Sequence, residues 1–150
     1  MIGWAVAMNN ISIEPIIMFL IIFIWTPSHF WALSLYKFKD YEKAKIPMLP
    51  ITAGIKKTKL NILVYAIFMF PVVIAPFFIG FGSIIYLALS LGMTIYYINL
   101  CYLLFKTKTV SKSNLIARKV FIYSIFYLFF LFLLILFDNL FKLNEIIRFF

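Results

Sequence analysis

The chain has 150 residues, of which 65% are hydrophobic and 13% are charged, and it carries a formal net charge of +9 at pH 7. Its mean hydropathy is +1.06. Soluble domains are roughly half apolar and about a quarter charged, so this composition excludes an ordinary soluble domain. The single cysteine, Cys101, excludes a disulfide framework and a cysteine-based metal centre. The composition predicts one all-α integral membrane region over residues 1–150, with the lipid bilayer and not nucleic acid as its partner.

Charged residues divide the chain into apolar stretches. Residues 15–36, 60–105 and 120–137 contain no Lys, Arg, Asp or Glu. A bilayer core of ~30 Å needs about 20 helical residues, so the first and third stretches each fit one spanning helix. The middle stretch is about twice as long as one span, so we expect it to reverse direction at Gly80–Ser83. The sequence therefore predicts four spans, at about 13–36, 61–79, 83–105 and 118–137.

Basic residues gather in two of the predicted loops. The loop at 37–59 contains seven lysines, and the loop at 106–119 contains four lysines and one arginine. Four spans place both loops on the same side of the membrane, and Lys and Arg favour the cytoplasmic side. We therefore expect both loops to face the cytoplasm and both termini to lie on the opposite side.

The segment at 26–50 holds the residues best suited to chemistry. If one helix continues through it, His29, Tyr36, Asp40 and Lys43 share one face, with His29 about 16 Å deeper than Asp40. Such a face suits an amphiphilic ligand with an anionic head. Lysines such as Lys37 and Lys43 would attract its phosphates or carboxylates, and Asp40 would hold Mg²⁺, which prefers oxygen ligands.

Simpler readings of the same residues stay open. The lysines would serve only as an orientation signal or as an anchor to anionic lipid headgroups, and Asp40 would form only solvated ion pairs. An ionisable group inside a span is usually functional, but His29 would alternatively hydrogen-bond a carbonyl freed by Pro27. We expect Asp138, at an outer helix end, to be exposed to solvent.

The segment also resembles a known family, the protoheme IX farnesyltransferases (haem O synthases) of the UbiA-type intramembrane prenyltransferases. The resemblance rests first on residues 25–33 (WTPSHFWAL), Tyr36, Asp40-Tyr41, Ala44 and residues 46–50 (IPMLP). It extends to Ile2-Gly3-Trp4 and to residues 117–121 (ARKVF), with Ser124-Ile125 and Tyr127-Leu128. The likeness therefore runs almost from end to end, and the central block is specific.

The resemblance implies a nine-helix enzyme of the bacterial cytoplasmic membrane, in which the four spans correspond to helices six to nine. It implies transfer of the farnesyl group of farnesyl diphosphate to a vinyl group of haem b, giving haem O and diphosphate with the help of Mg²⁺. Asp40 takes the acidic position of the family's second polar loop, with Lys37 and Lys43 beside it. His29 and Tyr36 are the candidates for contact with haem b.

Two departures from the family pattern qualify these expectations. Ser28 stands where the family usually has a second proline. The chain also begins near the family's midpoint, without the first acidic loop, so we expect a C-terminal half that is inactive alone, either a truncated gene product or one piece of a split enzyme with a separate N-terminal half. The alternative is a non-catalytic membrane subunit that binds haem or lipid, such as an oxidase assembly factor.

Overall fold

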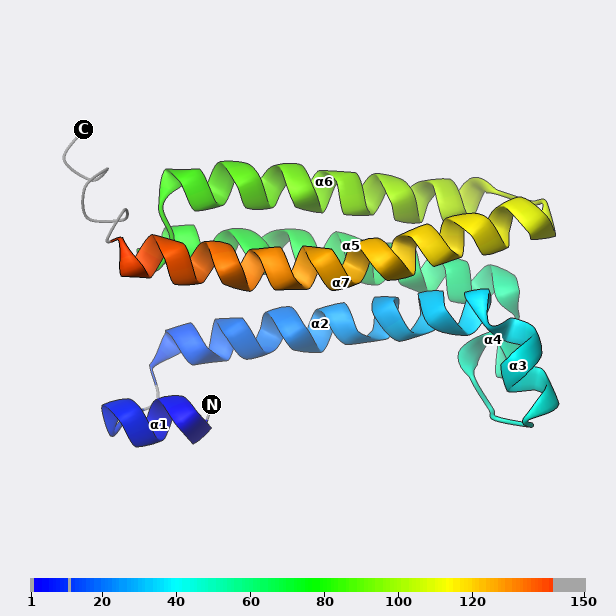
Figure 1. Ribbon diagram of the computed structural model, residues 1–150, viewed down its shortest axis with the longest axis horizontal. Helices are drawn as coiled ribbons and strands as arrows, with labels where there is room; N and C mark the ends of the chain where they lie inside the picture. Colours follow the sequence, from blue (N-terminus) through cyan, green and yellow to red (C-terminus); the bar gives the residue numbers. More distant parts are fainter. Residues whose placement is uncertain (1, 11, 142–150) are drawn as a thin grey trace.

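The protein was analysed as a computed structural model, which describes residues 2–10 and 12–141 (Figure 1). All regular structure in these two ranges is helical. The elements in chain order are α1 (Ile2–Met8), α2 (Ile13–Tyr36), α3 (Phe38–Lys43), α4 (Leu49–Thr52), α5 (Ile55–Phe78), α6 (Ile84–Lys106) and α7 (Val110–Leu140).

Four of the helices, α2, α5, α6 and α7, are long and apolar enough to cross a membrane. This confirms the predicted all-α membrane architecture. Two of them begin earlier than the predicted spans: α5 starts at Ile55, directly after Gly54 at φ 85°, and α7 starts at Val110, directly after the extended residue Thr109. The helices begin where the backbone leaves its extended or left-handed conformation, whereas the predicted spans were bounded by the charged residues.

The four long helices form a closed bundle. Helix α2 packs against α5 and α7, and α6 packs against the same two helices from the other side. Helices α5, α6 and α7 bury residues that lie mostly three or four positions apart, which is the spacing of one helical face. In α5 the buried face comprises Thr58, Lys59, Ile62, Ala66, Met69, Val73 and Pro76. In α7 it comprises Ser113, Ala117, Val120, Ser124, Tyr127, Leu131, Ile135 and Asp138.

The predicted reversal in the middle of the chain is confirmed. Gly80 adopts φ 78°, a backbone conformation that favours glycine, and α6 begins after Ser83. The hydroxyl of Ser83 caps α6 by accepting a hydrogen bond from the backbone N–H of Tyr86. This turn lies at the same end of the bundle as α1, whereas α3, α4 and the α6–α7 connection lie at the other end (Figure 1).

The prediction that Asp138 is exposed is wrong, because its side chain is only 3% exposed. Its carboxylate accepts hydrogen bonds from both the backbone N–H and the hydroxyl of Ser83. The neighbouring Asn139 donates to the carbonyl of Phe81 at 3.3 Å. Asp138 is buried because it continues the inward face of α7, and the α5–α6 turn closes over it.

Candidate functional site

The end of the bundle that carries α3 and α4 contains a cavity of about 360 Å³ with several charged residues in its lining. Three segments enclose it: the junction of α2 and α3, the first turns of α5, and the α6–α7 connection with the start of α7. Its charged lining residues are Lys37, Lys39, Asp40, Lys59 and Lys108. Four cations and one carboxylate around one cavity favour an anionic ligand. We call this the basic pocket.

Lys37 and Asp40 form an ion pair across one turn at the mouth of the basic pocket. The Lys37 Nζ atom lies 3.1 Å from a carboxylate oxygen of Asp40, with side-chain exposures of 48% and 67%. The Asp40 carboxylate accepts a hydrogen bond from the Lys37 ammonium, which raises the pKa of Lys37. Because both groups are exposed, water screens the pair, and it contributes little to stability. Both side chains are therefore available to a ligand.

Lys59 is the interior cation of the basic pocket. Its side chain is only 6% exposed, and its Nζ atom donates a hydrogen bond to the carbonyl of Thr107 at 2.8 Å. The sequence interpretation counted Lys59 among the loop lysines and missed this role. The position of Lys59 on the helix indicates its burial. It lies three residues before Ile62 and seven before Ala66, so it shares a helical face with these two fully buried residues.

The proposed helical face from His29 to Lys43 is not continuous. Helix α2 ends at Tyr36, Lys37 leaves helical geometry with φ −100° and ψ 25°, and a separate helix, α3, follows. Tyr36, Lys37 and Asp40 all line the basic pocket. Lys43 is exposed at the end of α3 and lies outside the pocket lining, and His29 lies outside it as well.

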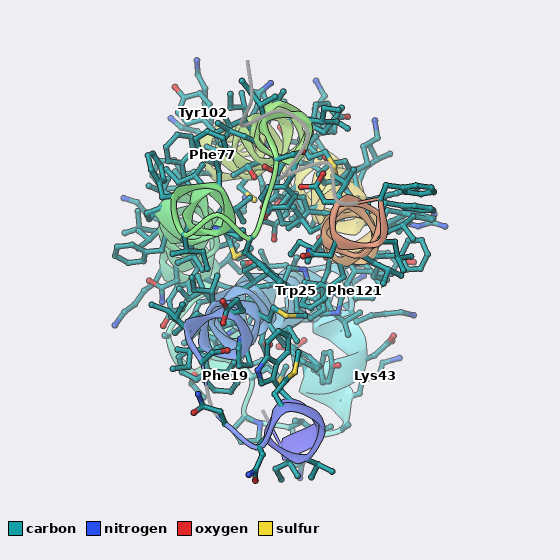
Figure 2. All side chains as sticks on the ribbon, turned by 90° about the vertical axis from the view of Figure 1, so that its left-hand side faces the viewer. Phe19, Trp25, Lys43, Phe77, Tyr102 and Phe121 are labelled. Atoms are coloured by element: carbon teal, nitrogen blue, oxygen red, sulfur yellow. The ribbon has the colours of Figure 1, made fainter. Side chains whose placement is uncertain are left out.

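His29 lies in the interface between α2 and α7. Its ring stacks on Trp25 at a centroid distance of 4.2 Å and on Phe121 at 4.8 Å, with interplanar angles of 20° and 29°. Figure 2, which looks along the bundle, shows Trp25 and Phe121 between these two helices. The Nδ1 atom of His29 lies 2.7 Å from the hydroxyl of Ser124 on α7, so its partner is not a carbonyl freed by Pro27.

The hydrogen bonds of Ser124 fix the proton position on His29. The Ser124 hydroxyl donates its one hydrogen to the carbonyl of Phe121 at 2.6 Å. Its oxygen must therefore accept from His29, so Nδ1 carries a proton. In the neutral ring the lone pair is then on Nε2. Since both faces of the ring are covered, this nitrogen edge is the part of His29 suited to accept a hydrogen bond or to ligate iron.

Hydroxyl pairs hold the interior of the bundle together. The hydroxyl of Ser28 lies 2.8 Å from that of Tyr97, and the hydroxyl of Thr94 lies 2.9 Å from that of Tyr127. These pairs join α2 to α6 and α6 to α7 in a setting with little water, where such bonds contribute to helix association. A proline at position 28 would supply no such bond.

The described residues offer few ligands for a metal ion. Within residues 2–10 and 12–141, no three His, Cys, Asp or Glu side chains are grouped closely enough to hold one. Asp40 can supply one oxygen ligand. Mg²⁺ usually keeps several waters and binds through one or two carboxylates together with substrate phosphates, so Asp40 fits a metal that arrives with a phosphate ligand.

A second cavity, of about 880 Å³, has an almost entirely apolar lining. Residues from α1, α2, α7 and the α5–α6 turn enclose it, among them Trp4, Trp25, Phe81 and Phe132. Trp25 contributes to this lining and also stacks on His29, so His29 lies directly behind the cavity wall. A cavity of this volume and composition suits an apolar chain or ring. We call it the apolar cavity.

Comparison with known proteins identifies the family. The model of the UbiA prenyltransferase family matches residues 1–131. The chain belongs to the UbiA prenyltransferase family. This UbiA chain is 54% identical over 139 residues to the protoheme IX farnesyltransferase of Pelagibacter ubique, covering 93% of the chain and 46% of that relative. It is 41% identical over 140 residues to the protein of the same name from Parvibaculum lavamentivorans, covering 93% of the chain and 44% of the relative.

A third relative with this name, from Rickettsia akari, is 48% identical over 136 residues, covering 89% of the UbiA chain and 43% of the relative. The chain therefore spans slightly less than half the length of the curated relatives it matches. No solved structure matches it. As a UbiA prenyltransferase with four helices of spanning length, it is a multi-pass membrane protein of a transferase family.

Proposed function

We propose that this chain forms part of a haem-farnesylating enzyme, which transfers the farnesyl group of farnesyl diphosphate to a vinyl group of haem b. The products would be haem O and diphosphate. The observation that carries the proposal is the basic pocket at one end of an apolar bundle, in a chain about half identical to a protoheme IX farnesyltransferase. The reaction needs both parts, because one substrate joins a charged diphosphate to an apolar chain.

The basic pocket would receive the diphosphate. Transfer breaks the bond between the farnesyl carbon and the diphosphate oxygen, and both electrons leave with the diphosphate. Nearby cations lower the energy of that leaving group. We assign this role to Lys37, while the exposed Lys43 would attract the anion from outside the pocket. Mg²⁺, held between Asp40 and the phosphate oxygens, would supply further positive charge.

Haem b would lie along α2 and α7, toward the apolar cavity. His29 and Tyr36 are seven residues apart on α2, which is roughly 10 Å along a helix. A ligand of haem size can reach both, with its apolar ring toward His29 and its carboxylates toward the basic pocket. Because the faces of the His29 ring are covered by Trp25 and Phe121, contact would be made through its Nε2 atom.

A separate N-terminal half would supply the part of the relatives' length that this chain does not cover. Helices α2, α5, α6 and α7 would then be helices six to nine of the enzyme. The basic loops would face the cytoplasm of a bacterial cell. Expression in a strain without its own haem O synthase tests the activity. The chain is produced together with the part of the Pelagibacter ubique relative that lies outside the match, and the extracted haems are separated and weighed by mass spectrometry.

The proposal expects haem O in the cells that contain both parts. Cells that contain only the part taken from the relative serve as the control. Unchanged haem b in the co-expressing cells, with both polypeptides present in the membrane, would instead favour a non-catalytic subunit that binds haem or lipid.

A further inference from the structure

We propose that the phosphate site extends to the α6–α7 connection and the start of α7. Lys108 in the connection and Asn114 in α7 bind a phosphate group of the ligand, and Lys59 positions them. This inference rests on the proposed function but concerns a different segment. The site expected from the sequence lies in the loop at 37–59, whereas Lys108 and Asn114 lie 49 and 55 residues after the end of that loop, on a different segment of the pocket lining.

Hydrogen bonds anchor the α6–α7 connection at Thr107. Thr107, the residue just before Lys108, accepts a hydrogen bond from the buried ammonium of Lys59 at 2.8 Å. Its own hydroxyl and backbone N–H both donate to the carbonyl of Leu103, at 2.7 and 3.1 Å. Both sides of the Thr107 backbone are therefore held. The backbone of Lys108 starts from a fixed point, although its side chain is exposed.

The start of α7 also lines the basic pocket. The backbone N–H of Ser113 donates to the carbonyl of Thr109 at 2.9 Å, so the first turn of α7 follows directly from the connection. Ser113 is buried, and Asn114 is exposed beside it, with both residues lining the basic pocket. The Asn114 amide supplies N–H donors to the same pocket that Lys108 lines. A cation and an amide donor in one pocket match the oxygen atoms of a phosphate group.

The lysines that line the basic pocket differ in their bonding partners. Lys37 already pairs with Asp40, and the Nζ atom of Lys59 bonds a backbone carbonyl. Lys108 faces the same cavity, and within the described ranges no salt bridge involves it. Lys108 therefore forms no ion pair with Asp40, the carboxylate in the pocket lining. Lys112 offers a matched comparison, since it is exposed on the first turn of α7, four residues after Lys108, but lies outside the pocket lining.

The shared chemistry of the ligand is a phosphate group with at least two charged oxygens. It has two possible sources: the diphosphate of an allylic substrate, or the phosphate of an anionic lipid headgroup. Both would meet the same donors at this end of the bundle. The experiment therefore measures binding of inorganic diphosphate and retention of lipid separately.

The 150-residue chain is placed in nanodiscs of phosphatidylcholine, and binding of inorganic diphosphate is measured by calorimetry in a buffer with EDTA. Lys108→Gln should weaken binding about tenfold, because it removes a charged hydrogen-bond donor, and Asn114→Ala should weaken it less. Lys112→Gln should change the affinity by less than about twofold. Equal affinities for the Lys108→Gln and Lys112→Gln proteins would overturn the proposal.

The role of Lys59 is tested by two substitutions. Lys59→Met should weaken diphosphate binding because it releases the carbonyl of Thr107, and Lys59→Arg should restore much of the affinity because guanidinium can donate to the same carbonyl. A merely structural role would lower the thermal midpoint of both variants without this difference in affinity. If the Lys59→Met protein remains folded and binds diphosphate like the parent protein, Lys59 is not a positioning residue.

A second arm identifies the source of the phosphate. Nanodiscs that contain phosphatidylglycerol are analysed by native mass spectrometry for lipid retained by the protein. If Lys108→Gln abolishes lipid retention and Lys112→Gln preserves it, the site binds a lipid headgroup. If the protein binds diphosphate but retains no lipid in this way, the site binds the substrate. Neither measurement needs haem, so failure of farnesyl transfer and failure of this site give different results.

Discussion

The Nδ1 atom of His29 lies 2.7 Å from the hydroxyl oxygen of Ser124, although 95 residues separate them in the chain. The carbonyl of the same serine accepts a hydrogen bond from the indole N–H of Trp25 at 2.9 Å. Trp25 and His29 are one helical turn apart on α2, and their rings stack. One residue of α7 therefore holds two aromatic side chains of α2, and it sets both the position and the protonation pattern of the histidine.

Replacing Ser124 with Ala should loosen this contact. The substitution leaves the Nδ1–H group of His29 without its acceptor in a buried interface, so the free energy of unfolding should fall by about 1 kcal/mol, as for other hydrogen bonds between membrane helices. The measurement is the thermal unfolding midpoint of the purified protein in detergent.

Ser90→Ala is the matched control for this experiment. Ser90 is also fully buried, but its hydroxyl donates to the carbonyl of Leu87 within its own helix, α6. It should therefore shift the midpoint less than Ser124→Ala does. An equal shift for both variants would mean that the contact between His29 and Ser124 adds nothing beyond the burial of a hydroxyl.

Asp138→Asn should destabilise the bundle strongly. The buried carboxylate accepts two hydrogen bonds from Ser83, and an amide can accept at only one of its two positions. Hydrogen bonds to charged groups contribute about 2 kcal/mol, so a loss of that order is expected in the free energy of unfolding. Asp40→Asn, an exposed substitution, should change it by less than about 1 kcal/mol. Similar losses in the two variants would contradict the buried role of Asp138.

Reporter fusions should place both basic segments on one side of the membrane. Fusions after Lys45 and after Thr109 should give the cytoplasmic signal, and a fusion after Gly82 should give the signal of the opposite side. The physical reason is the excess of lysine in the first two segments and its absence at the turn. A cytoplasmic signal at Gly82 would show that α5 and α6 do not form a hairpin across the bilayer.

In a farnesylating complex, Asp40 and His29 should affect different substrates. Asp40→Asn should raise the Mg²⁺ concentration needed for the use of farnesyl diphosphate and leave haem binding nearly unchanged, because it removes the charge that a hard cation requires. His29→Ala should alter the absorption spectrum or the affinity of bound haem without changing the Mg²⁺ requirement. Titrations with haem and with Mg²⁺ separate the two effects. Losses that follow only the yield of folded protein would assign both residues a structural role.

The helices and the central turn were predictable because they depend on local signals. Long uncharged stretches require spanning helices, and Gly80 permits the backbone of the turn. The positions of Tyr36, Lys37 and Asp40 around one pocket also followed from their closeness in the chain. The helix starts at Ile55 and Val110 were not predicted, because lysines at the edge of a membrane do not interrupt backbone hydrogen bonding.

The contacts between distant residues required the folded chain. Nothing local pairs Lys59 with Thr107 or His29 with Ser124. The burial of Lys59 and Asp138 was nevertheless detectable, because each continues the three- and four-residue spacing of apolar residues along its helix. Both were interpreted by their charge instead, and charge alone favours the surface.

Helix α6 meets a charged neighbour at each end: the carboxylate of Asp138 at its first turn and the ammonium of Lys59 near its last residue. The amino end of a helix carries partial positive charge and the carboxyl end partial negative charge, so each neighbour opposes the end that it contacts. Lys59 precedes α6 in the chain, but Asp138 follows Ser83 by 55 residues. During synthesis the carboxyl end of α6 can therefore be satisfied as soon as it emerges, whereas its amino end must wait for α7. Helix α7 therefore completes the hydrogen bonding at the start of α6.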